Sequence, residues 1–211
     1  MSLALGIFGG TFDPIHRGHV ECARELQQRL GFNRLDLLPC HLPAHRSTPS
    51  STSEHRLAMA QLAVEPLSGL GVDDRELRRG GPSYTADTLA EVRGELGDQA
   101  SLTFVMGSDA YNSLHQWVRW QSLFEFANVL VMGRDGVAVE PDAAVMAYTE
   151  PRRMDAAELI SKPSGAFAHI TLQPWPQSAT EVRRRLEAGE PLSGWLPEAV
   201  LDYISKHRLY C

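Results

Sequence analysis

Two histidines follow a glycine pair near the start of the chain, and together these residues suit the binding of phosphate. Gly9 and Gly10 allow a tight turn and a close approach of the backbone to a ligand, because neither carries a Cβ atom. His16 and His19 are three residues apart, so they face the same side of a helix. The N–H groups and positive dipole end at the start of such a helix attract anions. The stretch therefore predicts a phosphate-binding loop; the alternative is a glycine turn followed by surface histidines.

The same stretch resembles a family signature. The string Gly10-Thr11-Phe12-Asp13-Pro14, followed by His16-x-Gly18-His19, is similar to the signature of the nucleotidylyltransferase superfamily. In that superfamily the loop binds the phosphates of a nucleoside triphosphate. The resemblance implies a catalytic function for His16 and His19, and an ATP-binding function for Gly9, Gly10, Thr11 and Phe12.

A second string of this kind, Ser178-Ala179-Thr180-Glu181-Val182-Arg183, stands near the other end of the chain. Serine followed three residues later by glutamate is the pattern of a capping box, which explains Ser178 and Glu181 in structural terms alone. The string also resembles the second signature of the superfamily, Ser-x-Thr-x-x-Arg, which presents hydroxyls and a guanidinium to the triphosphate from a helix N-terminus. The resemblance implies that Ser178 and Thr180 bind ATP and that Arg183 acts in catalysis.

Residues 39–53 are predicted to form a long, partly mobile loop, since they mix proline, histidine and a Ser/Thr run. Within this loop, Pro43-Ala44-His45-Arg46 stands where superfamily members that make pyridine dinucleotides carry Pro-Pro-His-Lys. The resemblance implies a catalytic phosphate contact for Arg46 and a mononucleotide contact for His45. Arginine keeps the charge of lysine but replaces a compact ammonium by a planar fork. The alternative is a solvated basic loop.

Further positions resemble the same pyridine branch of the superfamily. Gly107-Ser108-Asp109 is similar to the Gly-Ala/Ser-Asp element, whose aspartate accepts hydrogen bonds from ribose; Asp109 is also a candidate N-cap for the next helix. Trp117 corresponds to a tryptophan that lies against the pyridine ring, with burial in the core as the alternative. The resemblance implies that Gly107 and Asp109 bind ATP, and that Tyr84, Thr85 and Trp117 bind nicotinate mononucleotide.

Apolar runs of strand length alternate with helical patterns, which indicates βαβ units and a mainly parallel sheet covered on both faces. We therefore expect a single nucleotidyltransferase domain over residues 1–211, of the Rossmann-like doubly wound α/β class, with a small C-terminal helical extension from about residue 174. The loops after Phe8, Leu38 and Met106 should converge beyond the carboxyl ends of the strands. The expected strands are 3–8, 35–38, 72–77, 102–106, 129–132 and 170–172, and the expected helices are 21–30, 54–64, 86–96, 114–126 and 198–205, the last packed on the sheet.

The composition narrows the class of protein. The 211 residues carry a formal net charge of −6, which argues against a broad nucleic-acid surface, and no apolar run reaches the roughly 18 residues that a membrane span requires. The first strand begins too early to leave room for a secretion signal, so a cytoplasmic protein is expected. Three cysteines without CxxC spacing predict neither a zinc site nor a disulfide framework. No protein side chain is expected to hold a metal, and Mg²⁺ would arrive on the ATP phosphates.

The resemblance implies transfer of the adenylyl group of ATP to nicotinate mononucleotide, giving deamido-NAD and pyrophosphate in NAD biosynthesis. The attacking phosphate is already ionised at neutral pH, so the reaction requires positioning and electrostatic stabilisation rather than a base. The alternatives are an enzyme like the pantetheine-phosphate adenylyltransferases, a non-catalytic nucleotide sensor of the same fold, and a tRNA-binding module. The acidic charge counts against the last, and the intact histidines and Arg183 count against the sensor. Residues 133–168, Arg134 included, and the oligomeric state receive no assignment.

Overall fold

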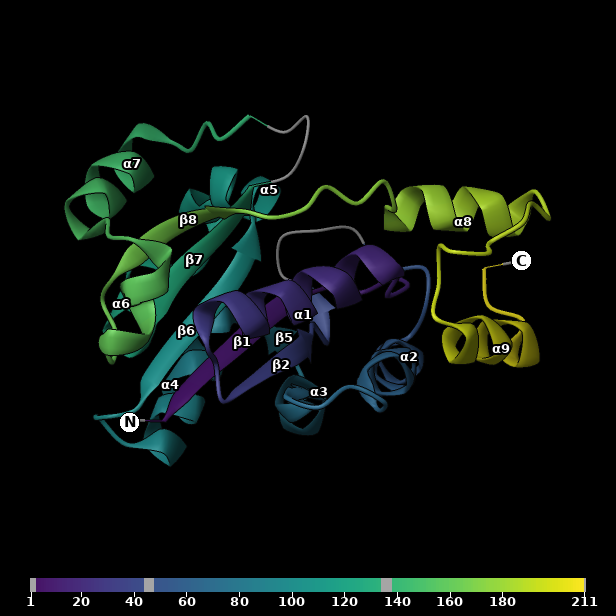
Figure 1. Cartoon of the computed structure of the whole chain (residues 1–211), viewed down its shortest axis with the longest axis horizontal. Helices are drawn as coiled ribbons and strands as arrows, with labels where there is room; N and C mark the ends of the chain where they lie inside the picture. The colour runs from purple at the N-terminus through teal and green to yellow at the C-terminus, as the bar shows by residue number, and fades with distance from the viewer. Residues whose placement is uncertain (1–2, 44–47, 134–137, 211) are drawn as a thin grey trace.

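The architecture is organised around a parallel sheet with the first strand of the chain near its middle. The computed structural model describes residues 3–43, 48–133 and 138–210 (Figure 1). Within these residues six strands form one sheet: β1 (Ala4–Gly10), β2 (Arg34–Pro39), β4 (Leu70–Val72), β6 (Ser101–Gly107), β7 (Asn128–Gly133) and β8 (Phe167–Thr171). Their order is β4-β2-β1-β6-β7-β8, and each neighbouring pair is parallel. The chain winds outward from β1 to β4 and then outward again from β6, which confirms the expected doubly wound α/β class.

Helices cover both faces of this sheet (Figure 1). Because neighbouring residues of a strand point to opposite faces, β1 and β6 contribute to two separate cores. Among the described helices, none combines the length and apolar composition that crossing a membrane requires. The first core contains residues of α1 (Arg17–Leu30), α2 (Ser53–Val64), α8 (Ala179–Glu187) and α9 (Glu198–His207), and the second contains residues of α4 (Thr85–Leu96), α5 (Ser108–Asn112), α6 (Leu123–Phe126) and α7 (Ala143–Thr149).

Residues 72–77, expected as one strand, instead form the end of β4 and the short helix α3 (Arg75–Arg79). Asp73 ends the strand, because its carboxylate accepts hydrogen bonds from the backbone N–H of Arg75 at 3.0 Å and from its Nε at 2.6 Å. A local acceptor of this kind competes with the hydrogen bonds of a strand. The strand therefore ends at Val72, and the charged residues 73–76 that follow it form the turn into α3 and its start.

The expected helix 114–126 is also interrupted. Leu114–Gln116 and Trp120–Ser122 form 3₁₀ turns, and α-helical structure begins only at α6. Between the two turns Trp117 is extended, and Arg119 is left-handed with φ 55°. The Trp117 ring packs edge-on against Phe104 of β6 at a centroid distance of 6.3 Å. This tertiary contact overrides the local helical pattern.

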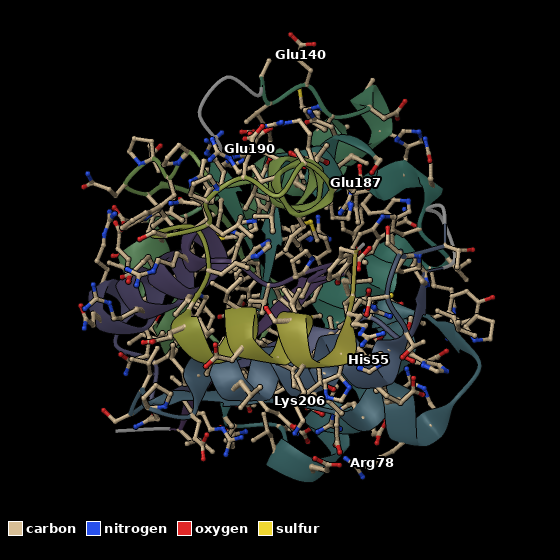
Figure 2. The ribbon with its side chains drawn as sticks, turned by 90° about the vertical axis from the view of Figure 1, so that its right-hand side faces the viewer. His55, Arg78, Glu140, Glu187, Glu190 and Lys206 are labelled. Carbon is tan, nitrogen blue, oxygen red and sulfur yellow. The ribbon has the colours of Figure 1, made fainter. Side chains whose placement is uncertain are left out.

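The C-terminal extension consists of α8 and α9, which lie together at one end of the molecule (Figure 1). The expectation that the last helix packs on the sheet is wrong, because α9 lies against α2 (Figure 2). Tyr203 of α9 shares a 2.9 Å hydrogen bond with Nδ1 of His55 in α2, and the two rings meet edge-on. Val200 and Ile204 of α9 are buried in the first core together with Met59 and Ala60 of α2, so α9 extends this core beside α2.

Arg56 of α2 is 1% exposed and holds together the chain segments that leave β1 and β2. Its Nη1 donates to the carbonyl oxygens of Thr11 at 2.8 Å and Cys40 at 2.6 Å. Its Nη2 donates to the carbonyl of His41 at 2.9 Å, and its Nε to that of Ser51 at 3.3 Å. Burial lowers the pKa of Arg56 from its ordinary value, although a guanidinium stays charged at neutral pH. Buried carbonyls must have partners, and this one side chain supplies them for the loops around the carboxyl edge of the sheet.

We predict that Arg56→Met lowers the free energy of unfolding by about 3 kcal/mol or more, because it leaves several buried carbonyl oxygens without donors. Urea denaturation measures the change. The matched control is Arg24→Met, since the Arg24 side chain is 53% exposed and pairs with Glu21 of the same helix. That variant should stay within about 0.5 kcal/mol of the parent. Equal stability of the two variants would contradict a structural function for Arg56.

Candidate active site

The glycine-histidine stretch 9–19 turns from the end of β1 into the start of α1. His16 directly precedes α1 and is 3% exposed, and His19 lies in the first turn of the helix. Their rings stack with centroids 3.6 Å apart, which confirms that both face the same side. Nδ1 of His19 accepts a hydrogen bond from the backbone N–H of His16 at 3.3 Å, which places the proton of a neutral His19 on Nε2. Gly18 leaves room for the pair, since a Cβ there would lie 3.1 Å from Nδ1 of His16.

Gly9 and Gly10 leave space for neighbouring aromatic rings as well as for the approach of a ligand. A Cβ on Gly9 would lie 2.8 Å from the ring of Phe104, and a Cβ on Gly10 would lie 2.7 Å from the ring of Phe12. Phe12 itself is left-handed, with φ 49°, and is 2% exposed. Its ring meets the His19 ring edge-on at a centroid distance of 5.1 Å. A ligand would therefore meet the main chain of Phe12 rather than its ring.

The second signature meets the first at Asp13. Arg183 of α8 donates from Nη1 to the carbonyl oxygen of Asp13 at 2.6 Å, and its Nη2 lies 3.5 Å from Oγ1 of Thr180. Ser178 precedes α8, and its Oγ accepts the backbone N–H of Glu181 at 3.2 Å, as a capping serine does. The Glu181 carboxylate pairs instead with guanidinium groups of its own helix. The N-terminus of α8 thus lies beside the loop that precedes α1.

The turn before α4 lies beside the loop that follows β2. The short strands β3 (Leu42–Pro43) and β5 (Pro82–Ser83) form a parallel pair, and the backbone N–H of His41 donates to Oγ of Ser83 at 3.0 Å. Tyr84 follows β5 and precedes α4, and Thr85 is the first residue of that helix, as expected. In the first turn the N–H of Asp87 donates to the carbonyl oxygen of Tyr84 at 3.0 Å, whereas those of Thr85 and Ala86 have no acceptor within the helix. Outside the described residues lie His45 and Arg46.

An ion pair joins the Trp117 segment to the first turn of α4. Nη2 of Arg119 lies 2.6 Å from Oδ1 of Asp87, and the two side chains are 55% and 42% exposed. Trp117 is half-buried, with one edge on Phe104 and part of its surface open to solvent. The structure therefore brings Trp117 and Thr85 to the same part of the surface, although Trp117 is extended rather than helical.

The loop after β6 contributes the third part of the site. β6 ends at Gly107 and α5 begins at Ser108, so Gly107 is the N-cap of the helix, and the alternative of Asp109 as N-cap is wrong. Asp109 lies in the first turn of α5 and is exposed. A Cβ on Gly107 would meet open space. Because β1 and β6 are parallel neighbours, this turn and the loop after β1 lie at one edge of the sheet.

Asp13 and Tyr210 are two residues of this region that sequence reasoning missed. Asp13 is 7% exposed, and its carboxylate accepts the backbone N–H groups of Ser50 at 2.7 Å and Ser51 at 3.1 Å. The hydroxyl of Tyr210 donates to Oδ1 of Asp13 at 2.7 Å. Nη1 of Arg183 lies 4.0 Å from Oδ2 of the same carboxylate. The aspartate within the first signature was a usable indication, whereas nothing in the local sequence marks Tyr210.

The groups that converge at this edge are hydrogen-bond donors and a cation. The guanidinium of Arg183 and the N-terminal turns of α1 and α8 supply N–H groups of the kind that bind phosphate. In residues 3–43, 48–133 and 138–210, no cluster of three or more His, Cys, Asp or Glu side chains could hold a metal ion. This donor set suits a polyphosphate that carries its own cation.

Known proteins resemble this chain over its full length. Residues 7–185 match the family described as Cytidylyltransferase-like. A protein of Cellvibrio japonicus, named as a nicotinate-nucleotide adenylyltransferase, is 40% identical over 210 residues, which is 100% of both chains. A protein of Pseudomonas putida strain W619 with the same name is 41% identical over 206 residues, or 98% of this chain and 94% of that one.

Solved structures resemble the fold as well. Plasmodium falciparum nicotinic acid mononucleotide adenylyltransferase, complexed with NaAD, superposes with a TM-score of 0.74 at 18% identity and covers 99% of this chain and 97% of its own. A structure from Vibrio parahaemolyticus, titled as a nicotinate-nucleotide adenylyltransferase, gives a TM-score of 0.65 at 17% identity, over 99% and 95% of the two chains. At these identities the likeness confirms the α/β fold.

We predict that Gly10→Ala destabilises the protein by about 1–3 kcal/mol, because the new methyl group displaces the buried ring of Phe12. Gly94→Ala is the matched control, since Gly94 lies within α4 and a Cβ there meets nothing within 4 Å. That substitution should stabilise by up to about 1 kcal/mol through helix propensity. Thermal and urea unfolding of both variants measure the difference. A Gly10→Ala protein as stable as the parent would show that the loop accommodates a side chain at this position.

Proposed function

Since the chain belongs to the cytidylyltransferase-like family, and within it to the nicotinate-nucleotide adenylyltransferases, we propose that its two signature segments hold ATP while the α4 turn and Trp117 hold nicotinate mononucleotide. The enzyme transfers the adenylyl group of ATP to nicotinate mononucleotide, giving deamido-NAD and pyrophosphate, a step of NAD biosynthesis. The 2.6 Å hydrogen bond from Arg183 to Asp13 carries the site assignment, because it joins the second signature to the first. Neither the pantetheine-phosphate alternative nor the non-catalytic sensor gains support from the relatives.

In the proposed ATP site, the triphosphate lies between the loop after β1 and the start of α8. Charge gathers at the α-phosphate as the nucleotide phosphate attacks and pyrophosphate departs, so fixed donors lower the barrier. Nε2–H of His19 and the guanidinium of Arg183 are such donors. His16 supports them through its stacked ring. The residues assigned to bind ATP are Gly9, Gly10, Thr11, Phe12, Gly107, Asp109, Ser178 and Thr180, and those assigned to catalysis are His16, His19, Arg46 and Arg183.

In the proposed mononucleotide site, the pyridine ring stacks on Trp117 and its carboxylate faces the first turn of α4. The backbone N–H groups of Thr85 and Ala86, which have no acceptor within the helix, and the positive dipole end of α4 favour an anion. The Arg119 ion pair compensates the charge of Asp87, which would otherwise oppose the carboxylate there. The residues assigned to this site are Tyr84, Thr85, Trp117 and His45, of which His45, like the catalytic Arg46, is assigned from the sequence alone.

We further propose that Mg²⁺ reaches the site bound to the ATP phosphates, where it neutralises charge and orients the leaving pyrophosphate. The carboxylate of Asp13 already accepts three hydrogen bonds, so in this proposal it is not a metal ligand, and the protein contributes hydrogen-bond donors to the phosphates. The enzyme works in the cytoplasm as one nucleotidyltransferase domain without a nucleic-acid partner, in keeping with its net charge of −6.

A pyrophosphate-release assay tests the function directly. ATP is supplied with nicotinate mononucleotide, nicotinamide mononucleotide or pantetheine phosphate, and the dinucleotide product is identified by mass. We expect turnover with the pyridine mononucleotides and none above background with pantetheine phosphate. A protein that binds ATP but turns over no acceptor would support the sensor instead.

His19→Ala should lower turnover by roughly 100-fold or more, because a donor aimed at developing charge contributes mainly in the transition state. Single-turnover rates and ATP affinity, measured separately, should show a large loss of rate with a much smaller loss of binding. His16→Ala should act in the same direction with a smaller effect. His207→Ala serves as the control, since His207 lies on α9 and packs against Tyr203. An unchanged rate in His19→Ala would remove His19 from the catalytic groups.

We predict that nicotinate mononucleotide is preferred over nicotinamide mononucleotide by about tenfold to a hundredfold in kcat/KM. The amide must leave one polar group unmatched at the helix turn, which costs about 1–3 kcal/mol, and 1.4 kcal/mol corresponds to a factor of ten. Trp117→Ala should weaken both substrates alike, because stacking does not distinguish the two rings. The measurement is kcat/KM for both mononucleotides at fixed ATP.

The Arg119–Asp87 pair supplies the control for this preference. Arg119→Ala uncovers the Asp87 carboxylate and should reduce the preference by about twofold to fivefold, whereas Asp87→Asn should increase it by a similar factor. Both side chains are partly exposed, so the effects should shrink at high salt. A preference that neither variant changes would exclude the field of the α4 turn as its origin.

A further inference from the structure

Tyr210, which follows α9, reaches back to the loop where the two signatures meet. Its hydroxyl donates to Oδ1 of Asp13 at 2.7 Å, although 197 positions separate the two residues in the sequence. Tyr210 and Arg208 are both left-handed, with φ 61° and 51°. Residues other than glycine rarely adopt this backbone conformation. The segment after α9 is therefore bent into a specific shape that directs the phenol to Asp13.

The phenol acts as a donor in this contact. Burial raises the pKa of Tyr210 well above its ordinary value, and the Asp13 carboxylate raises it further. The hydroxyl therefore keeps its proton throughout the neutral range, and Asp13 is the acceptor. A hydrogen bond from a hydroxyl to a carboxylate is among the stronger ones in proteins.

Arg183 has two acceptors on Asp13 within reach. Its Nη1 donates to the main-chain carbonyl at 2.6 Å and lies 4.0 Å from Oδ2 of the carboxylate. A carboxylate that lacks donors would draw the guanidinium into a bidentate pair, and a guanidinium engaged in that way is less available to phosphate. Here the N–H groups of Ser50 and Ser51 and the hydroxyl of Tyr210 satisfy the carboxylate in its present orientation.

We propose that Tyr210 is a positioning residue for ATP: its hydroxyl holds the Asp13 carboxylate in place, so that Arg183 hydrogen-bonds the Asp13 main chain rather than its carboxylate and its guanidinium stays directed at the triphosphate. The inference rests on the proposed ATP-binding function of Arg183. It concerns one substrate only, because Tyr210 packs on the first core whereas Trp117 packs on the second. Loss of the hydroxyl should therefore affect ATP and leave nicotinate mononucleotide largely unaffected.

The test compares Tyr210→Phe with Tyr203→Phe. Both variants remove one phenolic hydroxyl from the C-terminal segment, but Tyr203 is bonded to His55 of α2 and not to Asp13. Calorimetric titration with a non-hydrolysable ATP analogue, kinetic constants for both substrates and thermal unfolding are measured for each. We expect Tyr210→Phe to weaken analogue binding and kcat/KM for ATP by about fivefold to tenfold. Its KM for nicotinate mononucleotide should stay within about twofold of the parent, and Tyr203→Phe should match the parent in both.

Unchanged affinity for the analogue in Tyr210→Phe would overturn the inference. A parallel loss for both substrates together with a lowered unfolding temperature would also overturn it, because the hydroxyl would then serve the fold rather than Arg183. The analogue titration needs no acceptor and no turnover. If the parent protein bound the analogue but formed no deamido-NAD, the proposed function would fail while the affinity difference would still decide the function of Tyr210.

Discussion

The buried guanidinium of Arg56 is the constraint on which the active-site edge depends. Parallel strands end at the same edge of a sheet, and the carbonyl groups beyond the last ladder hydrogen bond have no partners in the sheet. Arg56 donates to three such carbonyls in the loops after β1 and β2, and to the carbonyl of Ser51, two residues before α2. The N–H groups of a planar guanidinium point in fixed directions, so the acceptor carbonyls, and the loops that carry them, are held in fixed positions relative to one another. Burying the guanidinium costs a large desolvation free energy, which is offset only when all of its N–H groups have acceptors.

Asp13 provides the complementary acceptor in the same region. Its carboxylate accepts hydrogen bonds from backbone N–H groups of the segment that leads into α2. Arg56 donates hydrogen bonds to carbonyl oxygens of that segment and of its neighbours. The Asp13 charge also raises the pKa of Arg56 and so opposes the effect of burial. These two charges serve mainly to hold the loops and each other. The positive field presented to a ligand must then come from other groups, namely Arg183 and the helix N-termini.

Local patterns predicted the sheet, the turn from β1 into α1 and the helix at the second signature, because spacing and capping act within a few residues. The stacking of His16 on His19 follows directly from their three-residue separation. The helix expected over 114–126 failed because Trp117 packs on Phe104, a contact that no local pattern encodes. Arg56 stands in a helical pattern where an arginine reads as a solvated charge, and the Tyr210–Asp13 bond joins opposite ends of the chain. The long-range polar contacts that position the site were thus the part that sequence reasoning could not supply.

The remaining question is how a chain with a net charge of −6 presents a positive group to a polyphosphate. Three consecutive arginines occur in α8, but Arg184 pairs with Glu181 at 2.8 Å and with Glu190 at 2.7 Å, and Arg185 pairs with Glu181 at 3.0 Å. Glu190 and Glu187 lie at the α8 end of the molecule (Figure 2). Local ion pairs therefore compensate two of the three guanidinium groups on the surface, while Arg183 is directed inward to the loop before α1. Charges beyond about 8–10 Å are screened at physiological salt, so the acidic surface does not cancel a guanidinium in direct contact with phosphate. The ion pairs of Arg184 and Arg185 leave Arg183 as the arginine of α8 that faces the loop, so the proposed anion site depends on local contacts rather than on the net charge of the protein.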